Sequence, residues 1–138
     1  MKNTANVFFV RYGSYVNGFL SKKGEQEAAK AGKKIFKYLK GEGATVIVTS
    51  PLTRAVQTTS VMAKYLRVEL IQTENFLNYE VYCNRKKNFE RVKSSLAKAG
   101  YENIVFVSHQ PILDGFGVMG SGTGDAYVLI KGVVKKLK

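Results

Sequence analysis

The chain has 138 residues, of which 45% are hydrophobic and 23% charged, and its 22 basic and 10 acidic residues give a net charge of +12. This composition excludes an intrinsically disordered chain, and no apolar run approaches the ~20 residues of a membrane span. The length is most simply that of one domain, covering residues 1–138, with a sizeable core.

The chain contains one cysteine, Cys83, and one histidine, His109. A single cysteine cannot form an internal disulfide, so we expect a reducing compartment, the cytoplasm. A zinc site uses several cysteine and histidine ligands, so we expect no metal and no other cofactor. Residues 1–6 carry no apolar signal-peptide segment, and we expect no membrane partner.

Lysine supplies 17 of the 22 basic residues. A lysine-rich surface can simply keep a protein soluble, or it can attract a polyanion or an acidic partner. The chain has no recognisable nucleic-acid-binding motif, which favours the solvated surface.

Short apolar runs alternate with helical patterns along the chain, which predicts an α/β sandwich. The predicted strands cover Val7–Val10, Thr45–Val48, Arg67–Ile71, Ile104–Val107, Ala126–Ile130 and Val133–Val134, the last two as a hairpin around Lys131-Gly132. The predicted helices are one capped by Ser21 and ending at Lys40, then Ser50–Leu66, Lys87–Ala99 and Ile112–Met119, with loops over Ser14–Leu20 and Gln72–Asn84.

Polar residues follow three of the predicted strands directly. Arg11 follows the first, Arg54 lies in the helix start after the second, and His109 follows the strand Ile104–Val107. Ligands of open α/β sheets bind at the carboxyl ends of the strands. Arginine matches phosphate oxygens with a planar fork, and Arg54 also lies near the positive end of a helix. The three side chains together predict a phosphate site, in which His109 donates to the phosphate or exchanges a proton with a leaving group.

Four motifs resemble those of the histidine phosphatase superfamily, the phosphoglycerate-mutase-like fold, and most of all its compact phosphohistidine phosphatases of the SixA type. They span nearly the whole chain, and the second and third together are specific. The motifs are Phe8-Phe9-Val10-Arg11-Tyr12-Gly13, Leu20-Ser21-Lys22-Lys23-Gly24, Ser50-Pro51-Leu52-Thr53-Arg54-Ala55-Val56-Gln57-Thr58 and Val107-Ser108-His109-Gln110-Pro111.

The resemblance implies a three-layer α/β/α sandwich with a mixed, mostly parallel sheet. It also implies a catalytic set of Arg11, Tyr12, Arg54 and His109, in which the family has a nucleophilic histidine at the position of Tyr12. His109 matches the second family histidine, which binds the phosphoryl group. Only about one phenol in a thousand is ionised at pH 7, a phosphotyrosyl ester is less labile than a phosphohistidine, and the longer side chain reaches into the phosphoryl space. Tyr12 is therefore predicted to cripple covalent catalysis.

Three further side chains are weaker candidates. The resemblance suggests Asn17 as a phosphate ligand, although its spacing from Tyr12 is one residue short of the pattern in the larger mutases. Glu80 could match the general acid of larger family members, but SixA-type enzymes lack that residue. Glu80 and Asp114 are more simply surface carboxylates.

Three functions stay open from the sequence. The favoured one is a pseudo-phosphatase that binds phosphate, or a phosphorylated small molecule or protein side chain, through Arg11, Arg54, His109 and Asn17. The second is an active phosphomonoesterase or phosphohistidine phosphatase that uses Tyr12, or a water placed by His109. The third is a basic protein that binds polyanions through its lysines. The resemblance is to an enzyme family, but the residues do not establish that this chain is an enzyme.

Overall fold

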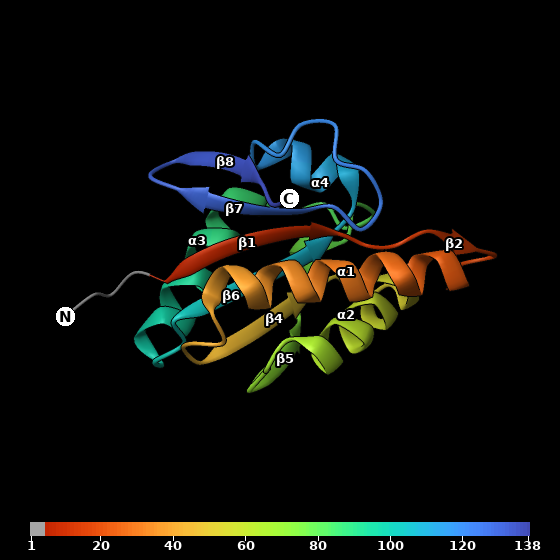
Figure 1. Cartoon of the computed structure of the whole chain (residues 1–138). Helices are drawn as coiled ribbons and strands as arrows, with labels where there is room; N and C mark the ends of the chain where they lie inside the picture. The colour runs from red at the N-terminus through yellow and green to blue at the C-terminus, as the bar shows by residue number, and fades with distance from the viewer. Residues whose placement is uncertain (1–4) are drawn as a thin grey trace.

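The computed structural model describes residues 5–138, which form a six-stranded sheet with the strand order β5-β4-β6-β1-β7-β8 (Figure 1). Strands β1, β4, β5 and β6 are parallel, whereas β7 runs antiparallel to β1 and β8 antiparallel to β7. The sheet is therefore mixed and mostly parallel, as expected. The strands are β1 (Asn6–Arg11), β4 (Thr45–Thr49), β5 (Leu70–Thr73), β6 (Asn103–Ser108), β7 (Ala126–Ile130) and β8 (Val133–Lys136).

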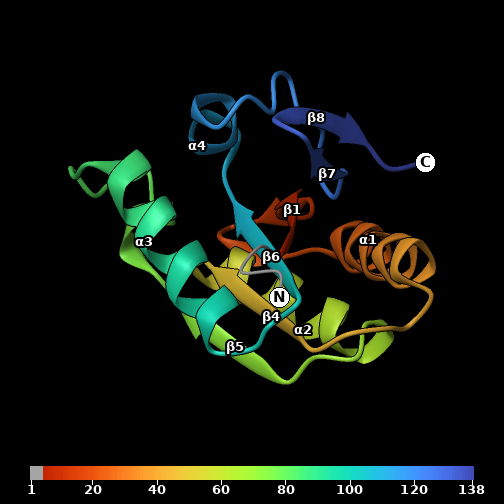
Figure 2. The same cartoon turned by 90° about the vertical axis from the view of Figure 1, so that its left-hand side faces the viewer.

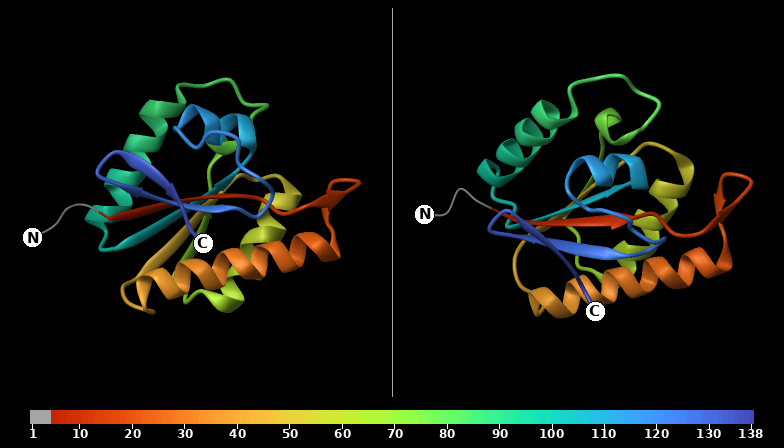
Figure 3. Two further views of the ribbon diagram at one scale, coloured as in Figure 1. Left: turned by 45° about the horizontal axis from the view of Figure 1, so that its top comes forward. Right: turned by 90° about the horizontal axis from the view of Figure 1, so that it is seen from above.

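Helices cover both faces of this sheet, which gives the predicted three layers (Figures 2 and 3). Helices α1 and α2 pack on one face and on each other, and α3 and α4 lie on the opposite face. The helices are α1 (Lys22–Leu39), α2 (Thr53–Tyr65), α3 (Arg85–Lys98) and α4 (Gln110–Gly115), with a short 3₁₀ helix η1 (Asn75–Leu77).

The buried strand β1 supplies side chains to both layers of the core. Val7 and Phe9 pack with residues of α3 and α4, whereas Phe8 and Val10 pack with residues of α1 and α2. Successive side chains of a strand point to opposite faces, so a strand covered on both sides reads as an uninterrupted apolar run. This is why the sequence pattern located β1, β4 and β6 correctly to within one residue at either end.

Two glycines allow the segment after β1 to cross the start of α1. A Cβ on Gly24 would lie 2.1 Å from the carbonyl oxygen of Ser14, and a Cβ on Gly13 would lie 2.5 Å from that of Gly24. Ser21 caps α1 as predicted: its Oγ accepts from the Gly24 N–H and donates to the Ser14 carbonyl. Two of the sequence motifs therefore meet here through backbone packing.

The prediction of a loop over Ser14–Leu20 is wrong, because this segment forms a hairpin. Strands β2 (Tyr15–Val16) and β3 (Phe19–Leu20) pair antiparallel and project beyond the carboxyl end of β1 (Figure 1). The turn residues Asn17 and Gly18 have φ angles of 53° and 83°. Asn-Gly with both residues at positive φ is the preferred two-residue hairpin turn, and this local signal could have identified the hairpin.

Two predicted helix boundaries are also wrong. Helix α2 begins at Thr53 rather than at Ser50-Pro51, because the N-cap residue Leu52 has extended backbone, with a ψ angle of 140°. Helix α4 covers Gln110–Gly115 rather than 112–119, since Pro111 fits its first turn and the positive φ of Gly117 follows its end. Strand β5 begins at Leu70, three residues later than predicted, and ends at Thr73.

Within residues 5–138, no helix has the length and apolarity needed to cross a membrane. The first four residues, which belong to the segment expected to lack a signal peptide, lie outside the described part of the chain.

The close backbone packing at Gly13 and Gly24 predicts that a single added methyl group strongly destabilises the fold. Gly24→Ala should lower the free energy of unfolding by about 2 kcal/mol or more, because the new Cβ overlaps backbone atoms that cannot move independently. Gly115→Ala is the matched control, since its Cβ would meet nothing within 4 Å and should change stability by less than ~1 kcal/mol. Urea denaturation measures the free energy of unfolding of both variants. Equal values would contradict the close backbone packing at Gly24.

Candidate functional site

The predicted arginines and histidine meet at one edge of the sheet. Arg11 ends β1, His109 directly follows β6, and Arg54 is the second residue of α2, after β4. Strands β4, β6 and β1 are parallel neighbours, so their carboxyl ends lie together. Topology alone therefore brings the three cationic or titratable groups to the same place.

The ring of Tyr12 lies among these groups. It is 5% exposed, its centroid lies 4.8 Å from the Arg54 guanidinium carbon, and it meets the His109 ring edge to face at 4.9 Å. The ring of Tyr12 therefore contacts both the second arginine and the histidine. We refer to Arg11, Tyr12, Arg54 and His109 as the strand-end cluster.

His109 is 1% exposed and is held neutral by its surroundings. Burial, together with the positive charges of Arg54 and Arg11, lowers the pKa of its imidazole to about 4. Its Nε2 lies 3.1 Å from the Ser50 Oγ, whereas its buried Nδ1 has no hydrogen-bond partner. An anion placed between the arginines and the ring would favour a proton on this histidine.

Arg54 lies against two aromatic rings. Its guanidinium carbon is 4.8 Å from the Tyr12 ring centroid and 4.3 Å from that of Tyr15, distances at which a cation is attracted to a ring face. Burial alone would lower the pKa of this guanidinium, but the hydroxyl groups of Tyr12, Tyr15 and Tyr79 outweigh it and raise the pKa. Arg54 is thus a permanent cation.

Arg11 is fixed from the segment before β7. Its Nη1 donates to the Ser121 carbonyl oxygen at 2.6 Å, while its buried Nε has no partner. The Nε of Arg54 and the Oγ of Ser121 are also buried without a partner. Buried polar groups are nearly always hydrogen-bonded, so these groups, together with His109 Nδ1, are suited to a ligand rich in acceptor oxygens.

A loop after η1 adds a side chain that the sequence did not indicate. The Tyr79 ring meets the His109 ring edge to face at 4.8 Å, so His109 lies between two phenols. Nη2 of Arg85 donates to the carbonyl oxygens of Asn78, Tyr79 and Val81 at 3.1, 3.4 and 2.7 Å. Arg85 therefore holds the loop that places Tyr79, and no local motif marks either residue.

The rest of the motif around Arg54 joins the hairpin to α2. Gln57 Oε1 accepts from the Leu20 N–H at 2.7 Å, and Thr58 Oγ1 accepts from the buried Gly13 N–H at 3.0 Å. These two residues contact backbone, and their role is to position the cluster. Ser50 Oγ, from the same motif, is close enough to His109 Nε2 for a hydrogen bond.

The other candidates lie outside the strand-end cluster. Asn17 is exposed in the turn of the β2–β3 hairpin, and its role as a phosphate ligand stays a prediction. Glu80 is exposed beside Tyr79, while Asp114 Oδ1 accepts from the Gly120 N–H at 3.2 Å and holds a turn. Among residues 5–138, no three His, Cys, Asp or Glu side chains are grouped so that they could hold a metal ion.

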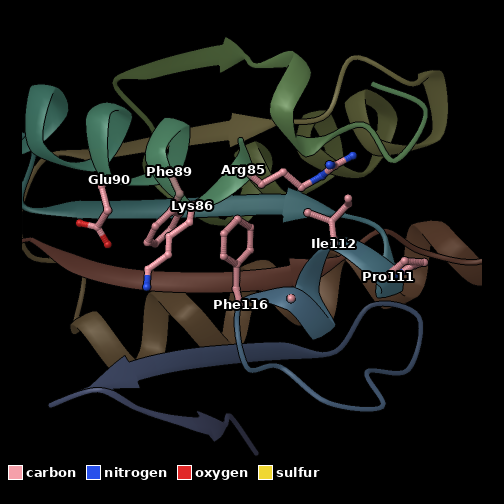
Figure 4. Close-up of a pocket in the computed structure, with 8 residues that line it drawn as sticks. Arg85, Lys86, Phe89, Glu90, Pro111, Ile112 and Phe116 are labelled. Carbon is pink, nitrogen blue, oxygen red and sulfur yellow. The ribbon is translucent and has the colours of Figure 1, made fainter. Parts of the chain in front are cut away.

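Tyr12 and His109 are buried within the strand-end cluster, whereas Arg11 and Arg54 are partly exposed. None of the five cavities measured within residues 5–138 is lined by Arg11, Tyr12, Arg54 or His109. The largest of the five, about 460 Å³, lies between α3 and α4 (Figure 4). The buried Tyr12 ring contacts both Arg54 and His109 and so lies beside the donors that an anion would use.

The lowered pKa of His109 predicts a loss of stability in mild acid. Below about pH 6.5 the histidine of the unfolded chain takes up a proton, whereas His109 of the folded chain stays neutral until about pH 4. The folded state therefore has its full contribution from this group above about pH 6.5 and loses stability as the pH falls from about 6.5 to about 4. Between pH 7 and pH 5 the native chain should lose up to about 2 kcal/mol more than His109→Gln. Urea denaturation at both pH values tests this, and NMR titration of the single histidine should give a midpoint near 4. A midpoint near 6.5 would contradict it.

Comparison with solved structures places this geometry in a known fold. The protein histidine phosphatase SixA in complex with tungstate matches with a TM-score of 0.73 and 19% identity, over 95% of this chain and 93% of that one. A SixA protein from Agrobacterium tumefaciens matches with a TM-score of 0.68 and 14% identity, over 98% and 96%. Phosphoglycerate mutase from Plasmodium falciparum matches with a TM-score of 0.61 and 18% identity, over 97% and 89%. At these identities the likeness shows the fold alone.

Sequence comparison supplies the family. No curated protein matches the chain by sequence. The model of the histidine phosphatase superfamily, branch 1, matches residues 9–99, well over half of the chain. This segment contains Arg11, Tyr12 and Arg54, and the SixA-like fold brings His109 to them. The chain therefore belongs to the histidine phosphatase superfamily.

Proposed function

We propose that residues 1–138 form a single phosphate-binding domain that does not turn over phosphoesters through a phosphohistidine, a pseudo-phosphatase. The observation that carries this proposal is the Tyr12 ring, 4.8 Å from the Arg54 guanidinium and 4.9 Å from the His109 ring. The resemblance assigns the position of Tyr12 to the attacking histidine. The remaining cluster keeps the charges that recognise phosphate and lacks the imidazole that would attack it.

The unpartnered donors support phosphate as the ligand. Nε of Arg11 and Nε of Arg54 are buried without hydrogen bonds, and they flank a histidine that is neutral in the absence of an anion. Phosphate oxygens would accept from both arginines, and the negative charge would stabilise the imidazolium. Phosphorylated small molecules and protein side chains share this chemistry. The net charge of +12 would add long-range attraction for such a ligand or for an acidic partner.

A slow hydrolase is the second candidate, and the unpartnered Nδ1 of His109 favours it. With a phosphoryl group bound and its charge favouring the imidazolium, His109 could donate a proton from Nδ1 to the leaving oxygen while water attacks phosphorus. This route makes no covalent intermediate, so it would not depend on the phenol oxygen of Tyr12.

Aryl phosphate hydrolysis separates these functions. We expect negligible turnover of para-nitrophenyl phosphate by the native chain and measurable turnover by Tyr12→His, because the variant restores an imidazole at the strand end. Tyr12→Phe is the control for the phenol oxygen. Robust native turnover that is lost in Tyr12→Phe, with phosphotyrosine trapped at residue 12, would contradict the pseudo-phosphatase; turnover retained in Tyr12→Phe would support the water route.

Phosphate binding should depend on Arg54. Removing one charge-assisted hydrogen-bond donor in Arg54→Gln should weaken the affinity for inorganic phosphate by about tenfold or more. Arg67→Gln removes the same charge from an exposed position after α2 and should leave the affinity almost unchanged. The NMR signal of His109 reports both titrations. Equal weakening by the two variants would mean that only net charge attracts the anion.

A further inference from the structure

The cavity between α3 and α4 has the features of a second ligand site. Its volume of about 460 Å³ falls within the range of small-molecule pockets. The rings of Phe89 and Phe116 lie 4.7 Å apart and belong to the aromatic cluster that also contains Phe9 and Phe106 (Figure 4). Ile112, on α4, completes an apolar floor.

Gly115 leaves one wall of this cavity open. A Cβ built on Gly115 would meet no atom within 4 Å, and its φ lies outside the left-handed region. A larger residue would therefore fit the backbone here and would fill the space with its side chain. Only a hydrogen occupies the position where other residues of α4 carry a side chain, and Phe116 beside it is partly exposed, whereas Ile112 is 5% exposed and contributes little surface.

The charges at the rim favour an anion. Arg85 contributes mainly its aliphatic stem, since its guanidinium points away toward the loop carbonyls that it binds (Figure 4). The Glu90 carboxylate lies 3.1 Å from Lys93 Nζ, and this ion pair compensates its charge. Within residues 5–138, Lys86 forms no ion pair, so its ammonium is the uncompensated charge at the cavity.

We propose that this cavity binds a small organic anion with a flat apolar body, of the class of aryl carboxylates and sulfonates. The aromatic part would pack on Phe89, Ile112 and Phe116 in place of water, which is the main favourable contribution. The acid group would face the Lys86 ammonium, whose exposure keeps that contribution modest. This site is separate from the strand-end cluster and does not depend on the proposed function.

The test uses 8-anilinonaphthalene-1-sulfonate, a fluorescent aryl sulfonate, as the probe on the native full chain. Gly115→Leu should weaken binding more than tenfold, because the side chain occupies the space of the aromatic body. Lys86→Gln should weaken binding about threefold, and Lys87→Gln, which removes the same charge from a neighbour that does not line the cavity, should not. Urea denaturation verifies that each variant is folded.

Three results would overturn the proposal. Unchanged probe affinity in Gly115→Leu would place the probe elsewhere, for example on the exposed apolar hairpin. Equal effects of Lys86→Gln and Lys87→Gln would show attraction by net charge only. Sedimentation that shows a native dimer converted to a monomer by Gly115→Leu would show that a second copy of the chain covers the cavity. Probe-induced shifts of the Ile112 and Phe116 amide signals, absent in Gly115→Leu, would instead confirm the site directly.

Discussion

The contact of the Tyr12 ring with Arg54 and His109 determines what this site can do. The Arg54 guanidinium carbon and the His109 ring centroid both lie within 5 Å of the Tyr12 ring centroid, so this ring occupies space beside the groups that would bind a phosphoryl group. Cation–ring attraction and edge-to-face packing each contribute up to about 1–2 kcal/mol in such buried settings. On the proposed function, the ring therefore competes with phosphate for contact with these two groups.

The scaffold around this contact holds its parts with little freedom. Arg11 is tied to the Ser121 carbonyl, the backbone after Tyr12 is tied to Thr58, and the close approach of Gly13 and Gly24 fixes where α1 starts. Because these restraints act on the backbone and on Arg11, and because Tyr15 still packs on Arg54, replacing the side chain at position 12 should leave most of the anion-binding geometry in place. This is the physical reason for treating binding and turnover as separable in this chain.

The sequence was most informative where a single physical rule dominates. Uninterrupted apolar runs located β1, β4 and β6, and parallel pairing then brought Arg11, Arg54 and His109 to one edge. Boundaries set by local chemistry were harder to place. The extended backbone of Leu52 places the start of α2 after Pro51, and the positive φ of Asn17 belongs to a hairpin where a loop was expected. The Asn17-Gly18 pair was a signal for that hairpin, whereas Pro51 does not by itself mark a start at Thr53.

Other parts of the site carry no local signal. Tyr79 approaches His109 because Arg85, six residues later, binds three loop carbonyls. Ser121 meets Arg11 across 110 residues of sequence. Contacts of this kind depend on the completed tertiary structure, and residue type or spacing does not predict them. The motif that resembles the family located the charges, whereas the environment of those charges came only from the structure.

The most direct test of the account compares the affinity of inorganic phosphate for Tyr12→Ala and for the native chain, by calorimetry at one ionic strength. If the ring occupies the anion space in about nine molecules of ten, its removal should tighten binding about tenfold, because the competent state is then always populated. Unchanged or weaker binding by a folded Tyr12→Ala protein would show that the ring does not stand between phosphate and the donors of Arg11, Arg54 and His109.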